Sequence, residues 1–388
     1  MFERMILTIF SLLGILNGAF LSVIFRRKRF YFYMAGSWLI SFISAGYFLW
    51  YARGYEGLGL WSLYVGYLAC GLMVAEIIAL PCLFILSFLS MPKRLLKVSR
   101  WLALGVLLLA AGTGLYGAVD GNTSEKVEHL DVYVEGLPPA FEGYKAAQMT
   151  DTHIGPYFRY TDLPGEIDRA RSEGAQVLFF TGDLIDDIRH MPEAADTLKE
   201  KYPAFPDGIY YVWGNHEYYR GKDYIEKELL KTPVKLLVND HDAITRDGAS
   251  LYVAGVDYPW SRGRAMEIEM DSMTDEAFRG IPKGAPVVLL AHHSAFLDEG
   301  FRKGAAITLT GHTHGTQFGL FGRPIITPFT YTRGLYSDGK NVGYVSRGDA
   351  SWFPFRFSCP RELVIITFHR NLKSREIISI SEMGLPSR

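Results

Sequence analysis

Apolar residues are distributed unevenly along this chain. Residues 1 to about 118 are mostly apolar and aromatic, whereas the remainder has the composition of an ordinary globular domain. A helix needs about 20 apolar residues to span a bilayer, and the first region holds four candidate stretches: 5–25, 30–50, 60–89 and 101–116. The pattern therefore predicts an all-α transmembrane region of about four helices over residues 1–118. The third stretch is over-long, which predicts a tilt or a bend near Pro81.

Shorter apolar runs follow in the second part of the chain and alternate with helix-like stretches. The strand-like runs are 146–149, 177–180, 209–212, 251–256, 287–290 and 306–309, and the helix-like stretches are 163–172, 192–201, 224–230 and 270–278. This alternation predicts an α/β domain. We expect a linker with a first short strand (132–134) over residues 119–144, and one domain over 145–388. Strands at 363–368 and 376–381 would complete a sheet.

Basic residues in the loops predict an orientation in the membrane. Two loops are basic, the first with Arg26, Arg27, Lys28 and Arg29, and the second with Lys93, Arg94, Lys97 and Arg100. The remaining loop offers only Arg53, offset by Glu56. The positive-inside rule places the basic loops in the cytoplasm, so the C-terminal domain would lie outside it. A cleaved signal peptide is disfavoured because the basic cluster follows the first apolar run.

The composition argues against a nucleic-acid-binding protein and against a protein built on cysteines. The formal net charge of −1 carries no basic footprint, so no nucleic-acid partner is expected. The three cysteines, Cys70, Cys82 and Cys359, define neither a disulfide framework nor a cysteine metal site. Glu76 is the one acid well inside a predicted span. It is either a functional group or a carboxyl that is hydrogen-bonded between helices.

Five polar clusters stand at or near the ends of strand-like runs. They are Asp151-Thr152-His153, Gly182-Asp183, Gly214-Asn215-His216-Glu217, His292-His293 and Gly311-His312-Thr313-His314, and they contain six of the ten histidines. In open α/β sheets, ligands bind just beyond the carboxyl ends of the strands. These clusters therefore predict a shared metal site.

The residue types in these clusters suit divalent ions. Asp151 and His153 are two residues apart, as are His312 and His314, and extended backbone would point each pair to one side. Carboxylate oxygen and imidazole nitrogen together suit Zn, Mn and Fe. Asp183 at a buried strand end needs a charge partner or a metal. Asn215 beside His216 favours one ligand plus one proton donor.

The ordered set D-x-H, G-D, G-N-H-E, H-H and G-H-T-H-G resembles the calcineurin-like metallophosphoesterase superfamily, over Lys145 to about Phe368. A membrane-anchored bacterial subgroup is similar at G-N-H-E-Y-Y (214–219), A-G-V-D (254–257) and G-H-T-H-G-T-Q (311–317). Thr150 and Thr316 depart mildly from the pattern, and neither removes a ligand. His293 stands where the subgroup often has Asn, so its role is open.

The resemblance implies a four-layer αββα sandwich and a role for each site residue. Asp151, His153 and His314 would hold one metal ion, and Asn215, His292 and His312 would hold a second. Asp183 would bridge the two ions, and His216 would be the catalytic proton donor. The expected cofactors are thus two divalent ions (Mn, Zn or Fe). Glu217 would orient a neighbouring histidine or form a surface ion pair.

The leading functional hypothesis is a membrane-anchored hydrolase of a phosphomonoester, phosphodiester or pyrophosphate, acting through a metal-activated hydroxide. A lipid-linked or cell-envelope substrate is a separate hypothesis. The alternatives are a scaffold domain that binds without turnover, and a membrane sensor or transporter regulated by the outer domain. Candidate pocket residues are Tyr218, Tyr219, Trp260, Arg262 and Arg333. We expect Asp186, Asp187, His129, His190, His241 and His369 to be solvated or turn residues.

Overall fold

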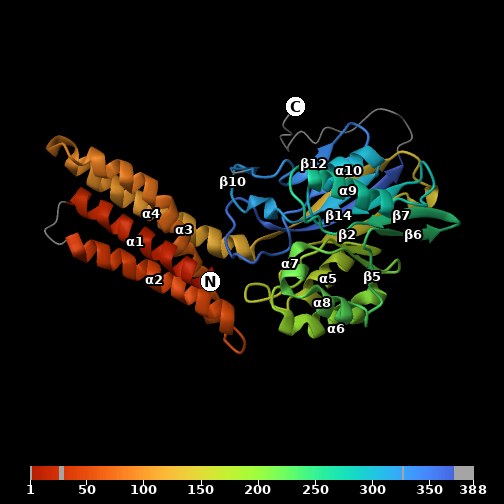
Figure 1. Cartoon of the computed structure of the whole chain (residues 1–388), viewed down its shortest axis with the longest axis horizontal. Coiled ribbons are helices and arrows are strands. Elements are labelled where there is room, and N and C mark those ends of the chain that lie inside the picture. The colour runs from red at the N-terminus through yellow and green to blue at the C-terminus, as the bar shows by residue number, and fades with distance from the viewer. Residues whose placement is uncertain (1, 26–29, 326, 371–388) are drawn as a thin grey trace. The chain divides into compact units, whose positions relative to one another are not determined.

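The computed structural model describes residues 2–25, 30–325 and 327–370, and the chain forms two compact units (Figure 1). The helical unit comprises the chain up to Ser124 together with Phe353–Ser358, and the sandwich unit comprises Glu125–Trp352 and the chain from Cys359 onward. The basic residues 26–29 and the expected strand 376–381 lie outside the described residues.

The helical unit contains four long helices, α1 (Phe2–Phe25), α2 (Phe30–Gly54), α3 (Leu60–Leu89) and α4 (Leu96–Thr123). Each is long and apolar enough to cross a membrane, which confirms the prediction of about four long apolar helices in this region. Many large apolar side chains face outward, including Trp61 and Leu108, as expected for surfaces that contact lipid. The fourth helix is longer than the apolar run 101–116, because helical hydrogen bonding continues through the more polar residues at both ends.

Glycine allows two of these helices to approach closely. A Cβ atom added at Gly114 of α4 would lie 2.0 Å from the carbonyl oxygen of Gly71 in α3. Such small-residue contacts are typical of helix pairs in membranes, where backbone proximity replaces the hydrophobic driving force. A larger side chain at Gly114 would therefore separate α3 from α4.

Glu76 of α3 is hydrogen-bonded between helices. Its carboxylate oxygen lies 2.5 Å from the hydroxyl of Ser41 in α2, and Asn17 Nδ2 of α1 donates to its backbone carbonyl at 3.1 Å. Glu76 also lines a cavity of about 370 Å³ whose walls come from all four helices. The hydrogen bond between helices that was expected for Glu76 is therefore present.

A short segment that lies late in the sequence packs within the helical unit. The Phe355 ring lies against Gly117 of α4, where an added Cβ would come within 2.4 Å of it. The backbone N–H of Arg356 donates to the carbonyl of Gly117 at 2.8 Å, and the Phe353 ring lies 5.9 Å from that of Phe48 in α2. This return was not predicted, because Phe353–Ser358 is only six residues long and carries no pattern of its own.

Among the described residues, the sandwich unit is built from two mixed six-stranded sheets. The first has the order β1-β14-β2-β3-β4-β5 and the second has the order β12-β13-β9-β8-β7-β6. The strands of the first are β1 (Glu125–Val134), β2 (Tyr144–Met149), β3 (Val177–Phe180), β4 (Ile209–Tyr211), β5 (Lys235–Leu236) and β14 (Arg361–Arg370). Those of the second are β6 (Asp240–Arg246), β7 (Ala249–Gly255), β8 (Val287–Leu290), β9 (Ile307–Thr310), β12 (Gly334–Ser337) and β13 (Val342–Val345). A two-stranded ribbon pairs β10 (Gly319–Leu320) with β11 (Arg323–Pro324).

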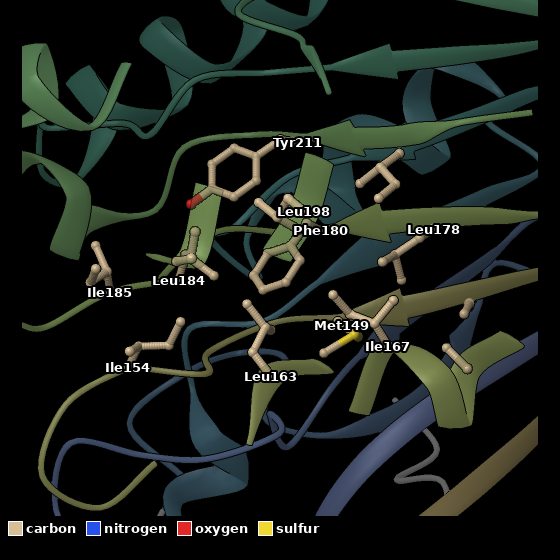
Figure 2. Packing of buried hydrophobic residues seen from close by; sticks show 14 of the residues in the cluster. Met149, Ile154, Leu163, Ile167, Leu178, Phe180, Leu184, Ile185, Leu198 and Tyr211 are labelled. Atoms are coloured by element: carbon tan, nitrogen blue, oxygen red, sulfur yellow. The ribbon is translucent and has the colours of Figure 1, made fainter. Parts of the chain in front are cut away.

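Helices cover the outer faces of both sheets (Figure 1). They are α5 (Leu163–Ser172), α6 (Met191–Lys201), α7 (Asn215–Arg220) and α8 (Lys222–Leu229) in the first half, and α9 (Arg264–Ala277) and α10 (Phe296–Lys303) in the second. Figure 2 shows Met149, Leu178 and Phe180 of the first sheet packed with Leu163 of α5 and Leu198 of α6. A separate apolar core lies between the two sheets, and a third lies under α9. The expected four-layer αββα architecture is confirmed.

Strand direction brings the polar clusters to one edge of each sheet. β2, β3 and β4 are parallel neighbours, and so are β8 and β9. The carboxyl ends of these five strands lead into the five clusters. The first strand is longer than the expected 132–134, since β1 pairs with β14 along ten residues, from Glu125–Arg361 to Val134–Arg370.

Candidate metal centre

The predicted ligands occupy tight loops with unusual backbone conformations. Asp151, His153, Asp183, His312 and His314 all have positive φ angles, between 45° and 71°. Residues other than glycine rarely adopt positive φ angles, and residues that do so are concentrated at functional sites. The expectation of extended backbone was therefore wrong for both i, i+2 pairs. A left-handed turn, and not a strand, brings each pair of side chains to one place.

Three predicted ligands converge at the ends of β2 and β9. The Nε2 atoms of His153 and His314 lie 3.1 Å apart. Asp151 Oδ1 lies 3.4 Å from His314 Nε2 and 3.7 Å from His153 Nε2. All three side chains are buried. Their ligand-type atoms lie close enough together to hold one metal ion.

Asp183 lies between this group and a second one. Its Oδ2 atom is 3.6 Å from His153 Nε2 and 3.1 Å from His292 Nε2. His292 also approaches Asp151 Oδ1 at 4.0 Å, and Asp151, Asp183 and His292 form another group able to hold an ion. One carboxylate thus faces histidines from both sheets.

Asn215 and His312 meet on the His292 side of the centre. His312 Nδ1 lies 2.9 Å from Asn215 Oδ1, and the His312 ring centroid lies 5.1 Å from that of His292. The structure therefore places all seven predicted ligands around one centre. Asn215 and His312 lie next to His292, but they belong to neither of the two groups of Asp and His side chains able to hold an ion.

The histidines are oriented as metal-binding histidines usually are. His292 Nδ1 lies 2.7 Å from the carbonyl of Thr181, and His314 Nδ1 lies 3.2 Å from the carbonyl of Ala350. When Nδ1–H donates to a carbonyl, the lone pair of Nε2 is left to face the centre. His292 Nε2 is buried, and it faces the carboxylates of Asp183 and Asp151. The donor set therefore fits a divalent cation.

Glycines precede the ligands because backbone and carboxylate approach closely there. A Cβ atom added at Gly214 would lie 2.1 Å from Asp183 Oδ1, and one at Gly311 would lie 2.2 Å from Asp151 Oδ2. Any side chain at either position would displace a carboxylate of the centre. This contact explains the glycine in the G-N-H and G-H-T-H motifs.

The side chain of Asp186 is mostly buried beside two site histidines, which differs from the prediction. It was expected to be a solvated or turn residue, but its side chain is only 9% exposed. Its Oδ1 atom lies 2.5 Å from His216 Nδ1, and its Oδ2 atom lies 3.4 Å from His153 Nδ1. Asp186 thus fixes the rings of two site histidines. Its position three residues after Asp183 was the available signal, but an acid at that spacing is common in turns.

Glu217 also differs from both of its predicted roles. It is fully buried and neither orients a histidine nor forms a surface ion pair. Its carboxylate accepts hydrogen bonds from the backbone N–H groups of Asp183, Leu184 and Gly214 and from the hydroxyl of Tyr211. Glu217 therefore joins the loop that carries Asp183 to the loop that carries Asn215 and His216.

Charges in the centre are strongly coupled. Burial alone would raise the pKa of Asp183, but His292 and His153 hold that pKa below its usual value. Burial would lower the pKa of His292, whereas Asp183 and Asp151 raise it to about 9. The buried carboxylates of the centre thus require nearby positive charge, which protons or a metal ion can supply.

Three histidines that were expected to be solvated or turn residues lie away from the metal centre. His129 is near Glu173, His241 Nδ1 faces the carbonyl of Ala277, and His369 lies between Glu142 and Asp131. His293 does lie at the centre. Its Nδ1 accepts from the backbone N–H of Ala295, and its ring lies 4.8 Å from that of His312.

Comparisons with known proteins agree with this geometry. Residues 144–316 match the calcineurin-like phosphoesterase family. An uncharacterized metallophosphoesterase of Bacillus subtilis, YkuE, is 28% identical over 275 residues, which cover 69% of this chain and 93% of that protein. A transmembrane protein with metallophosphoesterase domain from Danio rerio is 28% identical over 281 residues, which cover 67% of this chain and 61% of that protein.

Solved structures that match part of this chain include a NAD nucleotidase from Haemophilus influenzae, at 16% identity and a TM-score of 0.35, covering 53% of this chain and 45% of that one. A dimetal phosphatase from Danio rerio has 14% identity and a TM-score of 0.34, covering 53% of this chain and 88% of that one.

Fold and side chains define a domain of the metal-dependent phosphoesterase class, carried by a membrane protein. Through residues 144–316, the chain is similar to the calcineurin-like metallophosphoesterase superfamily.

Proposed function

We propose that the protein is a membrane-anchored phosphoesterase with a binuclear metal centre, which hydrolyses a phosphomonoester, phosphodiester or pyrophosphate. One observation carries the proposal. Asp183 Oδ2 lies 3.6 Å from His153 Nε2 and 3.1 Å from His292 Nε2, so this carboxylate would be within reach of an ion held on either side of it.

The two ion positions are proposed from the two groups. Asp151, His153 and His314 would hold one ion, Asn215, His292 and His312 would hold the other, and Asp183 would contact both. Their oxygen and nitrogen donors suit Mn, Zn or Fe. When bound, two such ions activate a water molecule and stabilise the attacking and leaving oxygens of an in-line displacement.

His216 is proposed as the proton donor to the leaving oxygen. Its Nδ1 atom is held by Asp186 at 2.5 Å, and its Nε2 atom lies 4.0 Å from Asp183 Oδ2. This histidine is partly exposed, whereas His153 and His292 are buried, so substrate can reach it. General acid catalysis of this kind contributes about 10²–10⁴-fold.

The membrane region is proposed to hold the centre on the extracytoplasmic side. The basic loops of the sequence support this orientation. Lipid phosphoesters and soluble phosphoesters are both available at a bilayer surface, so anchorage alone does not choose between them. A reporter fused to the C-terminus, active only outside the cytoplasm, tests the orientation.

The test of the proposed function pairs metal content with turnover. Full-length protein in detergent, loaded with Mn, should hydrolyse aryl phosphate monoesters or diesters and contain two ions per chain. Asp183→Asn should lose at least one ion and about 10²-fold or more of the activity. Asp168→Asn is the matched control, because Asp168 is an exposed acid that pairs with Lys201. Unchanged activity in Asp183→Asn would overturn the proposal, and two bound ions without turnover of any ester would favour the scaffold or sensor alternative.

A further inference from the structure

Three aromatic side chains line one side of the metal centre, and the proposed roles of the centre leave them unused. Tyr219, Tyr258 and Trp260 form a continuous group, hereafter the aromatic ridge. Trp260 lies 5.0 Å from Tyr258 and 5.8 Å from Tyr219, measured between ring centroids. The ridge is fixed in place, since Tyr218 packs on Trp260 at 5.0 Å while its hydroxyl donates to Asp257.

The ridge begins at the proposed proton donor and ends at the metal ligands. The ring of Tyr219 lies 5.6 Å from that of His216. Tyr258 lies 5.6 Å from His312 and 6.0 Å from His292. A group attached to the leaving oxygen would therefore extend from His216 over Tyr219 and Trp260.

Exposure leaves the outer part of the ridge available to a ligand. Tyr219 is 63% exposed and Trp260 is 45% exposed, although both are large aromatic side chains next to a buried polar centre. The ring contacts within the ridge are edge-to-face, with interplanar angles of 64° to 66°, so each contact leaves part of a flat ring surface uncovered. Flat uncovered rings bind planar groups by stacking.

We propose that the aromatic ridge is the leaving-group subsite and that the substrate is a phosphoester whose leaving group carries a planar aromatic ring. The proposal rests on the proposed function, because it takes His216 and the metal ligands as the reacting end of the site. Aromatic rings with polar edges, such as tyrosine and tryptophan, suit a planar group that is partly polar better than they suit a long alkyl chain.

A matched pair of esters tests the ridge. Benzyl phosphate and cyclohexylmethyl phosphate, each also supplied as its methyl diester, have equal numbers of leaving-group carbons and differ in planarity. Full-length protein with Mn should show a higher kcat/KM for the benzyl ester. Trp260→Ala should lower the benzyl value by about tenfold more than the cyclohexylmethyl value, within the range that aromatic stacking contributes. Trp260→Phe should restore most of the loss, and Tyr224→Ala, which removes an exposed ring of α8, should change neither.

Other outcomes overturn the subsite. Equal turnover of the two esters by the unaltered protein, or an equal loss for both in Trp260→Ala, excludes stacking. Preferred turnover of dodecyl phosphate, with loss in Trp260→Ala, would assign the ridge to lipid chains. Failure of the proposed function is distinguishable, because no ester would then be hydrolysed. The ridge would still be tested by calorimetric binding of benzylphosphonate, which Trp260→Ala should weaken about tenfold.

Discussion

His216 Nδ1 lies 2.5 Å from Asp186 Oδ1, so the proposed proton donor is held by a buried carboxylate. Asp186→Asn keeps the size of this side chain and removes its charge. We expect kcat to fall by about 10- to 100-fold, the usual cost of losing a group that orients a site histidine. Initial rates at saturating Mn measure the effect.

Asp187→Asn is the matched control for this change. Asp187 is the adjacent acid, and its carboxylate pairs with Arg189 instead of with a site histidine. The kcat of this variant should stay within about twofold of the unaltered protein, because the change leaves the contacts of His216 in place. If Asp186→Asn were as active as Asp187→Asn, Asp186 would have no part in positioning His216.

Removal of metal should destabilise the sandwich unit. Asp151 and Asp183 are buried carboxylates that share one centre, and an ion that binds only the folded state stabilises it. An ion present at 100 times its Kd adds about 2.7 kcal/mol to the free energy of unfolding. Thermal unfolding in detergent, with EDTA and then with Mn restored, measures this difference. Identical melting temperatures in the two conditions would contradict metal binding at the centre.

Glu217→Gln should lower both stability and metal binding. The carboxylate accepts four hydrogen bonds, and the amide of Gln would place a donor against backbone N–H groups of Asp183 and Gly214. Each buried group left unsatisfied costs about 1–3 kcal/mol. Melting temperature and Mn content of the purified variant measure the two effects. Glu193→Gln is the control, because Glu193 is an exposed residue of α6, and its variant should match the unaltered protein in both measurements.

Stability should fall as the pH rises through the range of Glu166. Burial and the neighbouring Glu125 raise the pKa of Glu166 to about 7. Its side chain is 16% exposed, and Arg361 lies 3.1 Å away. Because the folded state favours the protonated acid, the stabilising contribution is complete below the unfolded pKa of about 4.3 and is lost toward pH 7.

Glu166→Gln should remove that pH dependence. Each pKa unit corresponds to about 1.36 kcal/mol, so the variant should gain at most about 3 kcal/mol at pH 8 relative to pH 4. Melting temperatures from pH 4 to 8 measure the gain. Glu193→Gln, at an exposed position of α6, should keep the original profile. A Glu166→Gln profile that still falls with pH would assign the dependence to other groups.

Much of this fold could be predicted because its strands are buried on both faces. The runs ending at Phe180 and Leu290 are short and wholly apolar, and the run ending at Met149 contains one polar residue, Gln148. The polar residues after these runs are therefore conspicuous. The sequence placed the seven candidate ligands in one centre for this reason. The alternation of strands and helices then predicts parallel strands, and parallel strands bring their carboxyl ends to the same edge of a sheet.

Other features depend on contacts that no local pattern contains. Asp186 becomes buried only because the loop after β3 meets α7, which carries His216. The full length of β1 depends on pairing with β14, more than 200 residues later. Positive φ angles at Asp151 and His314 arise because the loops must turn sharply above the strand ends. Spacing alone indicated extended backbone at both places.

The return of Phe353–Ser358 to the helical unit bears on how this protein can be dissected. Cleavage of the chain between Ser124 and Glu125 would leave this second connection in place. A shortened protein that begins at Glu125 would present Phe353, Phe355 and Phe357 without Phe48, Gly117 and Tyr116, their partners in α2 and α4. Uncovered aromatic surface of this kind promotes aggregation. A soluble fragment would therefore need polar replacements at these three phenylalanines.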